Sequence, residues 1–144
     1  MNVFVSYSHA DAGMPERLRA HCAVLLREGR IGLWHDREIE AGAPFDQEIV
    51  RQLKASTHFV PLVSPDYLSS RYCESRELRA AIKLHRAGEL AIVPVILEPC
   101  DWRSSPLGRH KALPQDGKPV RLWRSRNAAL LNVVMEFRRL VQGR

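Results

Sequence analysis

The sequence has little that would support a disulfide-bonded or membrane-spanning protein. Its three cysteines, Cys22, Cys73 and Cys100, are odd in number, far apart and without C-x-x-C spacing, so neither a disulfide framework nor a zinc site is expected. The longest apolar run, residues 90–97, is too short to cross a bilayer. Because the N-terminus enters a strand-like segment with no basic-then-apolar signal, we expect a cytoplasmic protein without membrane contact.

The common motifs of nucleotide and hydrolase chemistry are also missing. No G-x-G-x-x-G follows the first predicted strand and no G-x-x-x-x-G-K-[ST] occurs, which argues against Rossmann and P-loop phosphate sites. A G-x-S-x-G nucleophile elbow is absent as well. The six histidines lack paired ligand spacing, so we expect neither a metal site nor a resident cofactor.

Acidic residues become scarce in the last third of the chain. Residues 1–100 hold 12 Lys or Arg and 13 Asp or Glu, whereas residues 101–144 hold 10 and 3, so that the two parts carry net charges of −1 and +7. A basic surface of this kind attracts nucleic acid, anionic nucleotides or an acidic partner, and it can equally be a solvated surface. No nucleic-acid-binding motif accompanies it, so any role of nucleic acid is expected to be indirect.

What the 144 residues do contain is a regular alternation of strand and helix patterns. Five apolar runs predict strands, of which the fourth, almost uniformly apolar, is the candidate central strand. These runs are residues 3–5, 31–34, 59–63, 90–97 and 119–123. Helical spacing is found between them, in residues 15–29, around residues 49–53, in a broken stretch from residue 64 to residue 88, and after residue 123. This alternation predicts one α/β domain over residues 1–144, a flavodoxin-like, doubly wound sheet of five parallel strands with helices on both faces.

A parallel sheet brings the segments that follow its strands to a single edge, where ligands bind. Residues 6–9, 36–45, 64–77 and 98–102 should therefore converge. Within the third of these segments, Glu77 falls on a helical stripe with Cys73 and Ala81, which places a carboxylate on or beside the inward face. This pattern is typical either of a functional carboxylate or of a salt bridge to a nearby arginine. Glu74, three residues earlier, points in a different direction and is the alternative.

Four separated motifs resemble those of TIR (Toll/interleukin-1 receptor) domains of the prokaryotic type. In chain order they are Val3-Phe4-Val5-Ser6-Tyr7-Ser8; Trp34-x-Asp36-x-x-Ile39-x-x-Gly42-x-x-Phe45-x-x-x-Ile49; Leu62-Val63-Ser64-Pro65-x-Tyr67-x-x-Ser70-x-Tyr72-Cys73-x-x-x-Glu77-Leu78; and Cys100-Asp101-Trp102 with Leu113-Pro114-x-Asp116-Gly117-Lys118-Pro119. Two aromatic positions depart from the family pattern, since Phe45 and Tyr72 stand where tryptophan is common. Glu77 lies five residues after Tyr72, where several members have four.

The resemblance implies cleavage of the nicotinamide–ribose bond of NAD, which is then a substrate and not a cofactor, with ADP-ribose or a cyclised form as product. It assigns the catalytic carboxylate to Glu77. The residues that it implies for substrate binding are Tyr7, Ser8, His9, Trp34, Asp36, Phe45 and Tyr72.

The resemblance also implies partners. Catalysis would be activated by self-association into a homo-oligomer or filament, in prokaryotic immune signalling against phage, with a fused or associated sensor module. The alternative is a non-catalytic TIR module that recruits other TIR domains by contact alone. Members of both kinds share the fold, so the fold does not choose between them.

Overall fold

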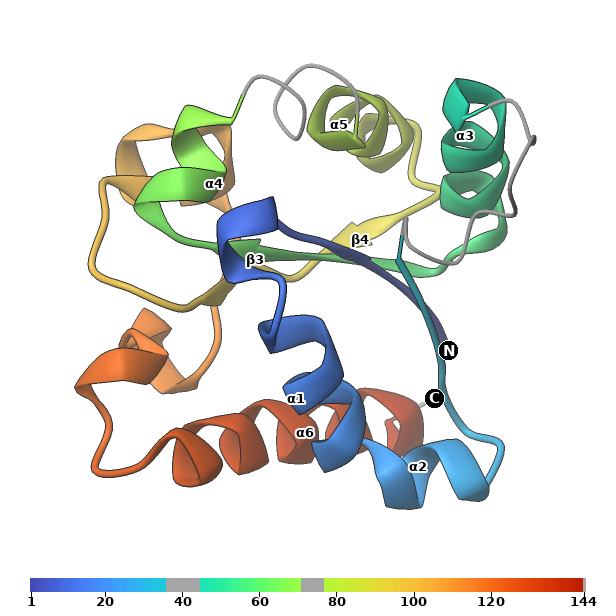
Figure 1. The fold of residues 1–144 in the computed structure, drawn as a ribbon. Helices are drawn as coiled ribbons and strands as arrows, with labels where there is room; N and C mark the ends of the chain where they lie inside the picture. Colours follow the sequence, from blue (N-terminus) through green and yellow to red (C-terminus); the bar gives the residue numbers. More distant parts are fainter. Residues whose placement is uncertain (36–44, 71–76, 144) are drawn as a thin grey trace.

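The computed structural model describes residues 1–35, 45–70 and 77–143, which form an α/β fold with a five-stranded parallel sheet (Figure 1). The strand order is β2-β1-β3-β4, and β5 pairs with β3 beyond the end of β4. The strands are β1 (Asn2–Ser6), β2 (Gly32–Trp34), β3 (His58–Val63), β4 (Ala91–Ile92) and β5 (Val95–Ile96). The flavodoxin-like fold class predicted from the sequence is confirmed, and β3 is the strand in the middle of the sheet.

The prediction of one continuous central strand over residues 90–97 is wrong, because the run is neither continuous nor in the middle of the sheet. The run forms two short strands, β4 and β5, separated by Val93 and Pro94. Proline has no backbone N–H, so it interrupts the hydrogen-bonded ladder. Both strands pair with β3 and together occupy the position beside it, while the outer side of β5 meets Leu113, whose backbone forms a parallel bridge with Val95.

The prediction of a strand over residues 119–123 is also wrong. The segment contains the 3-10 helix η7 (Val120–Leu122), which begins after Pro119. The amide of Arg121 donates to the carbonyl of Leu97 at 3.1 Å, but the following amides turn back to Pro119 and Val120. Val120 is buried, whereas Leu122 in the same run is exposed.

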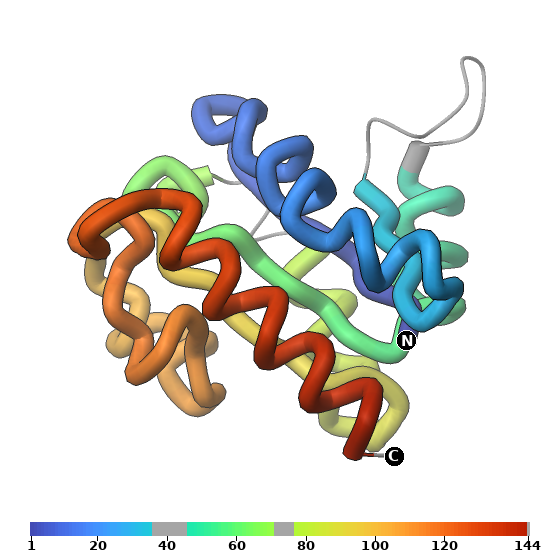
Figure 2. Tube along the Cα trace, turned by 90° about the horizontal axis from the view of Figure 1, so that it is seen from below, coloured from blue at the N-terminus to red at the C-terminus, as the bar shows by residue number. Residues whose placement is uncertain are grey.

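Helices α1, α2 and α6 cover one face of the sheet (Figure 2). Their bounds are α1 (Met14–His21), α2 (Ala23–Arg27) and α6 (Arg126–Gln142). The sequence predicted α1 and α2 as one helix that ends at Gly29; the chain instead breaks at Cys22, and Gly29, with φ +70°, ends the second part. The apolar stripe of α6 is confirmed, because Leu130, Val133 and Phe137 are buried against the sheet.

The opposite face of the sheet is covered by α3, α4 and α5 (Figure 1). These helices are α3 (Phe45–Ala55), α4 (Pro65–Ser69) and α5 (Arg79–Arg86). Two 3-10 turns, η4 (Trp102–Ser104) and η5 (Pro106–Arg109), add Trp102 and Leu107 to the core on this face. Two further 3-10 turns lie elsewhere, η1 (His9–Asp11) and η6 (Gln115–Gly117).

Alternation along β1 decides which residues face which layer. Val3, Val5 and Tyr7 belong to the core under α1, α2 and α6, whereas Phe4 belongs to the core under α3, α4 and α5. Successive side chains of a strand point to opposite faces, so Ser6 lies on the Phe4 side. Within the described residues, no helix is long and apolar enough to cross a bilayer.

Candidate functional site

The segments that follow β1 and β3 meet at the carboxyl edge of the sheet. Ser6, fully buried, places its hydroxyl 3.0 Å from the hydroxyl of Tyr67 on α4. Ser64 caps α4 by accepting from the amide of Tyr67 at 3.1 Å, and its own hydroxyl donates to Asp11 Oδ2 at 2.5 Å. Residues from two of the predicted segments, 6–9 and 64–77, are thus joined directly, and Ser64 also joins Asp11 to them.

The segment after β5 reaches the same edge. Leu97 and Glu98 line a groove of about 650 Å³ together with Asp11 and Ser64. The predicted convergence is therefore confirmed for the described residues that follow β1, β3 and β5. Residues 36–44 and 71–76 lie outside the described part of the chain, so their share of the edge stays a prediction.

Asp11 is the acidic group with a perturbed environment at this edge. Burial raises the pKa of its carboxyl, the hydrogen bond from Ser64 opposes that effect, and the charges of Asp66 and Glu98 raise the pKa further. Three carboxylates, those of Asp11, Asp66 and Glu98, therefore line the groove, and Arg121 forms a 3.0 Å ion pair with Glu98.

Glu77 lies in a π-helical turn directly before α5 and is only 2% exposed. The prediction that it faces inward is confirmed, since Ala81, one turn later, is fully buried on the same helix. Its neighbour Leu78 lines a cavity of about 280 Å³ with Tyr67 and Asp101. Glu77 itself is not among the lining residues of this cavity, and its catalytic role stays a prediction.

Tyr7, Ser8 and His9, the predicted nucleotide-lining residues, point in different directions. Tyr7 is 5% exposed in the core under α6, and its ring meets the edge of His35 with centroids 5.8 Å apart. Ser8 caps η1 by accepting from the amide of Ala10, and His9 is exposed. The structure does not place Tyr7 on the face of the sheet that carries Leu78.

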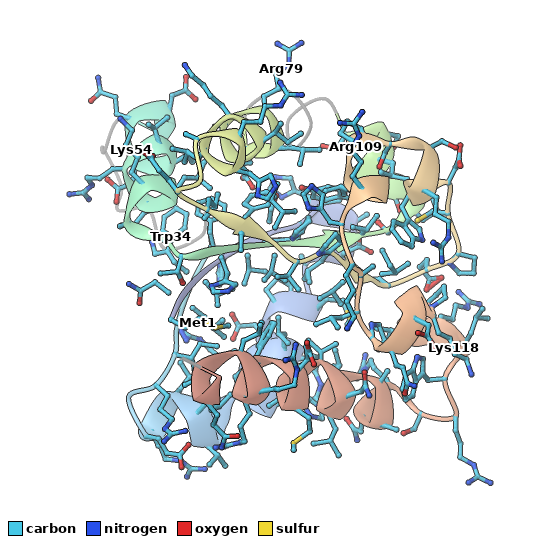
Figure 3. All side chains as sticks on the ribbon, turned by 180° about the vertical axis from the view of Figure 1, so that it is seen from behind. Met1, Trp34, Lys54, Arg79, Arg109 and Lys118 are labelled. Carbon is cyan, nitrogen blue, oxygen red and sulfur yellow. The ribbon has the colours of Figure 1, made fainter. Side chains whose placement is uncertain are left out.

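Trp34, by contrast, faces the α3–α5 side. It is half-buried and packs against Phe4 with ring centroids 5.0 Å apart. Figure 3 labels Trp34, which lies on β2, the edge strand of the sheet. His35, which the sequence reasoning missed, is 7% exposed and holds Nε2 3.5 Å from Glu16 Oε1. The signal for it was the alternation of β2, which puts His35 on the opposite face from Trp34 and therefore beside Tyr7.

Four further residues singled out from the sequence cannot be placed. Asp36, Tyr72 and Glu74 lie outside the described residues, and so does the side chain of Phe45, although the backbone of Phe45 begins α3. Among the residues that the structure does describe, no group of three or more His, Cys, Asp or Glu side chains is arranged to hold a metal ion. Cys22 and Cys100 are free thiols.

Comparison with known proteins gives a consistent family. A family model for the TIR domain matches residues 3–131. A protein of Sinorhizobium fredii, the uncharacterized protein y4lF, is 39% identical over 137 residues, which are 95% of this chain and 42% of that protein. The chain therefore spans about two fifths of the length of this relative.

Two solved structures share the fold. The TIR domain of the Toll-related receptor TRR-2 from Hydra magnipapillata has a TM-score of 0.62 at 19% identity, covering 94% of this chain and 97% of that one. The TIR domains of the activated Roq1 resistosome, which directly recognizes the pathogen effector XopQ, have a TM-score of 0.58 at 20% identity and cover 93% and 83%. At these identities the similarity is one of fold.

Proposed function

The chain belongs to the TIR domain family, and we propose that it hydrolyses or cyclises NAD with release of nicotinamide, using Glu77 as its catalytic carboxylate. The observation that carries this proposal is the position of Glu77, which is 2% exposed and comes directly before Leu78, a residue that lines a cavity. Carboxylates are rarely buried this far unless they are paired or serve a function.

The chemistry suits a single carboxylate. A sugar leaving group has to be protonated, which is why most glycosidases need two carboxyl groups. The nicotinamide of NAD is already cationic and leaves as a neutral molecule, taking the electron pair of the ribosyl bond. An ionised Glu77 would then stabilise the oxocarbenium-like ribose, which water or a second nucleophile captures. We further propose that Trp34, which lies on the same face of the sheet, helps to hold the substrate.

Burial of Glu77 also supports control by assembly. A side chain that is 2% exposed does not contact a dinucleotide in solution, so catalysis requires the chain around it to rearrange. We propose that contact between copies of the domain drives this rearrangement, with residues 36–45 of one copy completing the site of the next. Two different surfaces that meet head to tail generate an open array, a homo-oligomer or filament.

A sensor module is the proposed source of the trigger. The relative y4lF is more than twice as long as the matched region, which leaves length for a further domain in that protein. The Roq1 structure is described as an activated resistosome that recognizes an effector, and its TIR domains share this fold. By analogy, the proposed setting is cytoplasmic immune signalling in a prokaryote, an analogy of fold and not of sites.

Release of nicotinamide from NAD at increasing protein concentration tests the activity. Specific activity should rise with concentration or crowding, because assembly completes the site. Glu77→Gln, which is nearly isosteric, should lower turnover by roughly two orders of magnitude or more. Glu74→Gln and the exposed Glu89→Gln, matched in the charge removed, should remain near wild type. Full activity in Glu77→Gln would disprove the assignment, and loss of activity in Glu74→Gln alone would move it to that residue.

Mixing two inactive variants tests the shared site. Glu77→Gln removes the carboxylate, whereas Phe45→Ala damages only the segment proposed to complete the neighbouring site. In a random array of equal amounts, roughly one junction in four joins an intact carboxylate to an intact loop, so part of the activity should return. No recovery at any ratio, with co-assembly demonstrated, would show that each site is self-contained.

The second candidate function, a non-catalytic recruitment module, is favoured by the same burial, since a carboxylate closed off from solvent is compatible with a purely structural role. It predicts no nicotinamide at any concentration, together with assembly that Glu77→Gln leaves intact. Sedimentation and the nicotinamide assay on the same samples separate the two functions.

A further inference from the structure

A second concave surface lies between α5 and the turn formed by η4 and η5. It is a groove of about 920 Å³, and Figure 3 shows the labelled Arg109 on the α5 side of this turn. Its lining residues are Ile82, His85, Arg86, Arg103, Ser104, Ser105, Pro106, Gly108, Arg109 and His110. The turn separates this groove from the smaller cavity near Leu78, since Ser104, Ser105 and Pro106 line both.

Local sequence brings two arginines of the turn together. A Cβ atom at Gly108 would lie 2.0 Å from the carbonyl oxygen of Arg103, so only glycine permits the backbone to fold back this closely. Arg109 follows directly and reaches the same groove as Arg103. The guanidinium of Arg103 lies 4.5 Å from the ring centroid of Trp102, a stacking contact that orients it and uses none of its N–H donors.

Positive charge in the groove is not neutralised within the described chain. None of the described lining residues carries a carboxylate, and Arg86, Arg103 and Arg109 form no ion pair with any described residue. The carboxylate of Asp101 lies next to the turn but accepts a hydrogen bond from Ser104 at 2.7 Å. Three guanidinium groups thus converge on one concave surface with their donors available.

Two histidines extend this cationic surface. His85 Nδ1 lies 2.8 Å from the carbonyl oxygen of Leu90, so Nδ1 carries the proton and Nε2 is left for another partner. The rings of His85 and His110 meet edge to face with centroids 4.8 Å apart. Burial lowers the pKa of His110, and the nearby charges of His85 and Arg109 lower it further. An anion bound beside His110 would favour the protonated form that the neighbouring cations disfavour.

We propose that this groove is a binding site for a phosphorylated small molecule with at least two negative charges. Planar guanidinium groups bind phosphate oxygens in bidentate fashion, and the imidazoles add donors once protonated. The groove volume lies within the range of about 300–1,000 Å³ typical of small-molecule sites. This site is distinct from the one proposed for NAD cleavage, because its charges come from α5 and the η4–η5 turn and it does not include Glu77.

Inorganic pyrophosphate is a suitable probe, with binding measured by calorimetry at fixed ionic strength. Wild type should bind saturably with one site. Arg103→Gln/Arg109→Gln should weaken binding by about tenfold or more, since it removes two charge-assisted contacts. Arg27→Gln/Arg30→Gln is the matched control: it removes the same charge from exposed residues at the end of α2, on the opposite face of the sheet, and should bind as wild type does.

Proton uptake supplies a second readout that needs no variant. The titratable and charged groups that line the groove with His110 are His85 and Arg86 from α5, Arg103 from η4 and Arg109 from η5, all cationic when protonated. Bound pyrophosphate should therefore raise the pKa of His110, with proton uptake near neutral pH and saturable shifts of both imidazole resonances.

Absence of saturable binding to wild type, equal weakening in both double variants, or imidazole resonances that do not respond would each overturn the proposal. None of these measurements depends on NAD cleavage, so the two proposals fail or succeed separately.

Discussion

The hydrogen bond between Ser6 and Tyr67 joins the end of β1 to α4, and its removal should lower the free energy of unfolding by a measurable amount. The two hydroxyls are 3.0 Å apart, with Ser6 fully buried and Tyr67 1% exposed. Tyr67→Phe removes one hydroxyl without changing the shape of the ring. It leaves the other hydroxyl in a site that water does not reach, so the full desolvation cost of that group appears in the free energy of unfolding.

The expected loss is about 1–3 kcal/mol for Tyr67→Phe, the cost of a buried polar group without its partner. Ser6→Ala removes the same bond from the other side and should also destabilise the fold, by no more than Tyr67→Phe does. The double variant buries two apolar groups where the bond was, so it should be less destabilised than the sum of the two single variants. A coupling free energy of about 0.5–1.5 kcal/mol is expected.

Urea denaturation of the four proteins measures this cycle, with the slope of the transition checked for constancy. For a chain of 144 residues, each kcal/mol also corresponds to about 2–4 °C in Tm. A double variant whose loss equals the sum of the single losses would refute the reasoning, because it would show that the two hydroxyls contribute independently. A loss below about 0.5 kcal/mol in both single variants would show that water reaches the site.

Three further predictions concern groups elsewhere in the fold. Burial raises the pKa of Asp11, so the folded protein holds this proton more tightly than the unfolded chain and loses stability as pH rises above 3.8. In thermal melts, the stabilisation by Asp11→Asn should therefore be larger at pH 7 than at pH 4. A difference that does not depend on pH would contradict this prediction. Burial raises the pKa of Cys22 to about 12, so in a Cys73→Ser background iodoacetamide at pH 8 should leave Cys22 unmodified until denaturant is added, as mass spectrometry of peptides would show. Gly108→Ala should destabilise the chain by about 1–3 kcal/mol, since its methyl group meets the carbonyl of Arg103; unchanged denaturation midpoints would mean that the turn adapts.

Alternation and helical spacing were enough to predict most of the elements that build the sheet and its two layers. The strands at β1, β2 and β3 and the stripe of α6 followed from periodicity, because burial of one face requires that pattern in any context. The two errors in the second half share a cause. Pro94 and Pro119 sit within apolar runs, and the pattern of burial is the same whether the backbone is a ladder strand or a 3-10 turn.

The arrangement of the candidate site was also predictable only in part from the sequence. Inward burial of Glu77 was predictable from its helical stripe, and the meeting of the segments after β1, β3 and β5 was predictable from parallel order. The alternation of β1 indicates that Tyr7 faces the same side as Val3 and Val5, but the prediction for Tyr7 followed its place in a motif instead. The pairing of Tyr7 with His35 joins two strands, so it depends on the register of β1 against β2.

By itself, the sequence determined the fold class, the buried stripe of α6 and the position of a carboxylate on an inward stripe. These are local properties, set by side-chain periodicity and by the backbone limits of glycine and proline. Only the tertiary structure decided that Glu77 is closed off from solvent, that Trp34 and Tyr7 lie on opposite faces, and that Arg86 joins Arg103 and Arg109 in one groove. Such proximities join residues far apart in the chain, and they arise from how the layers pack, which no local pattern encodes.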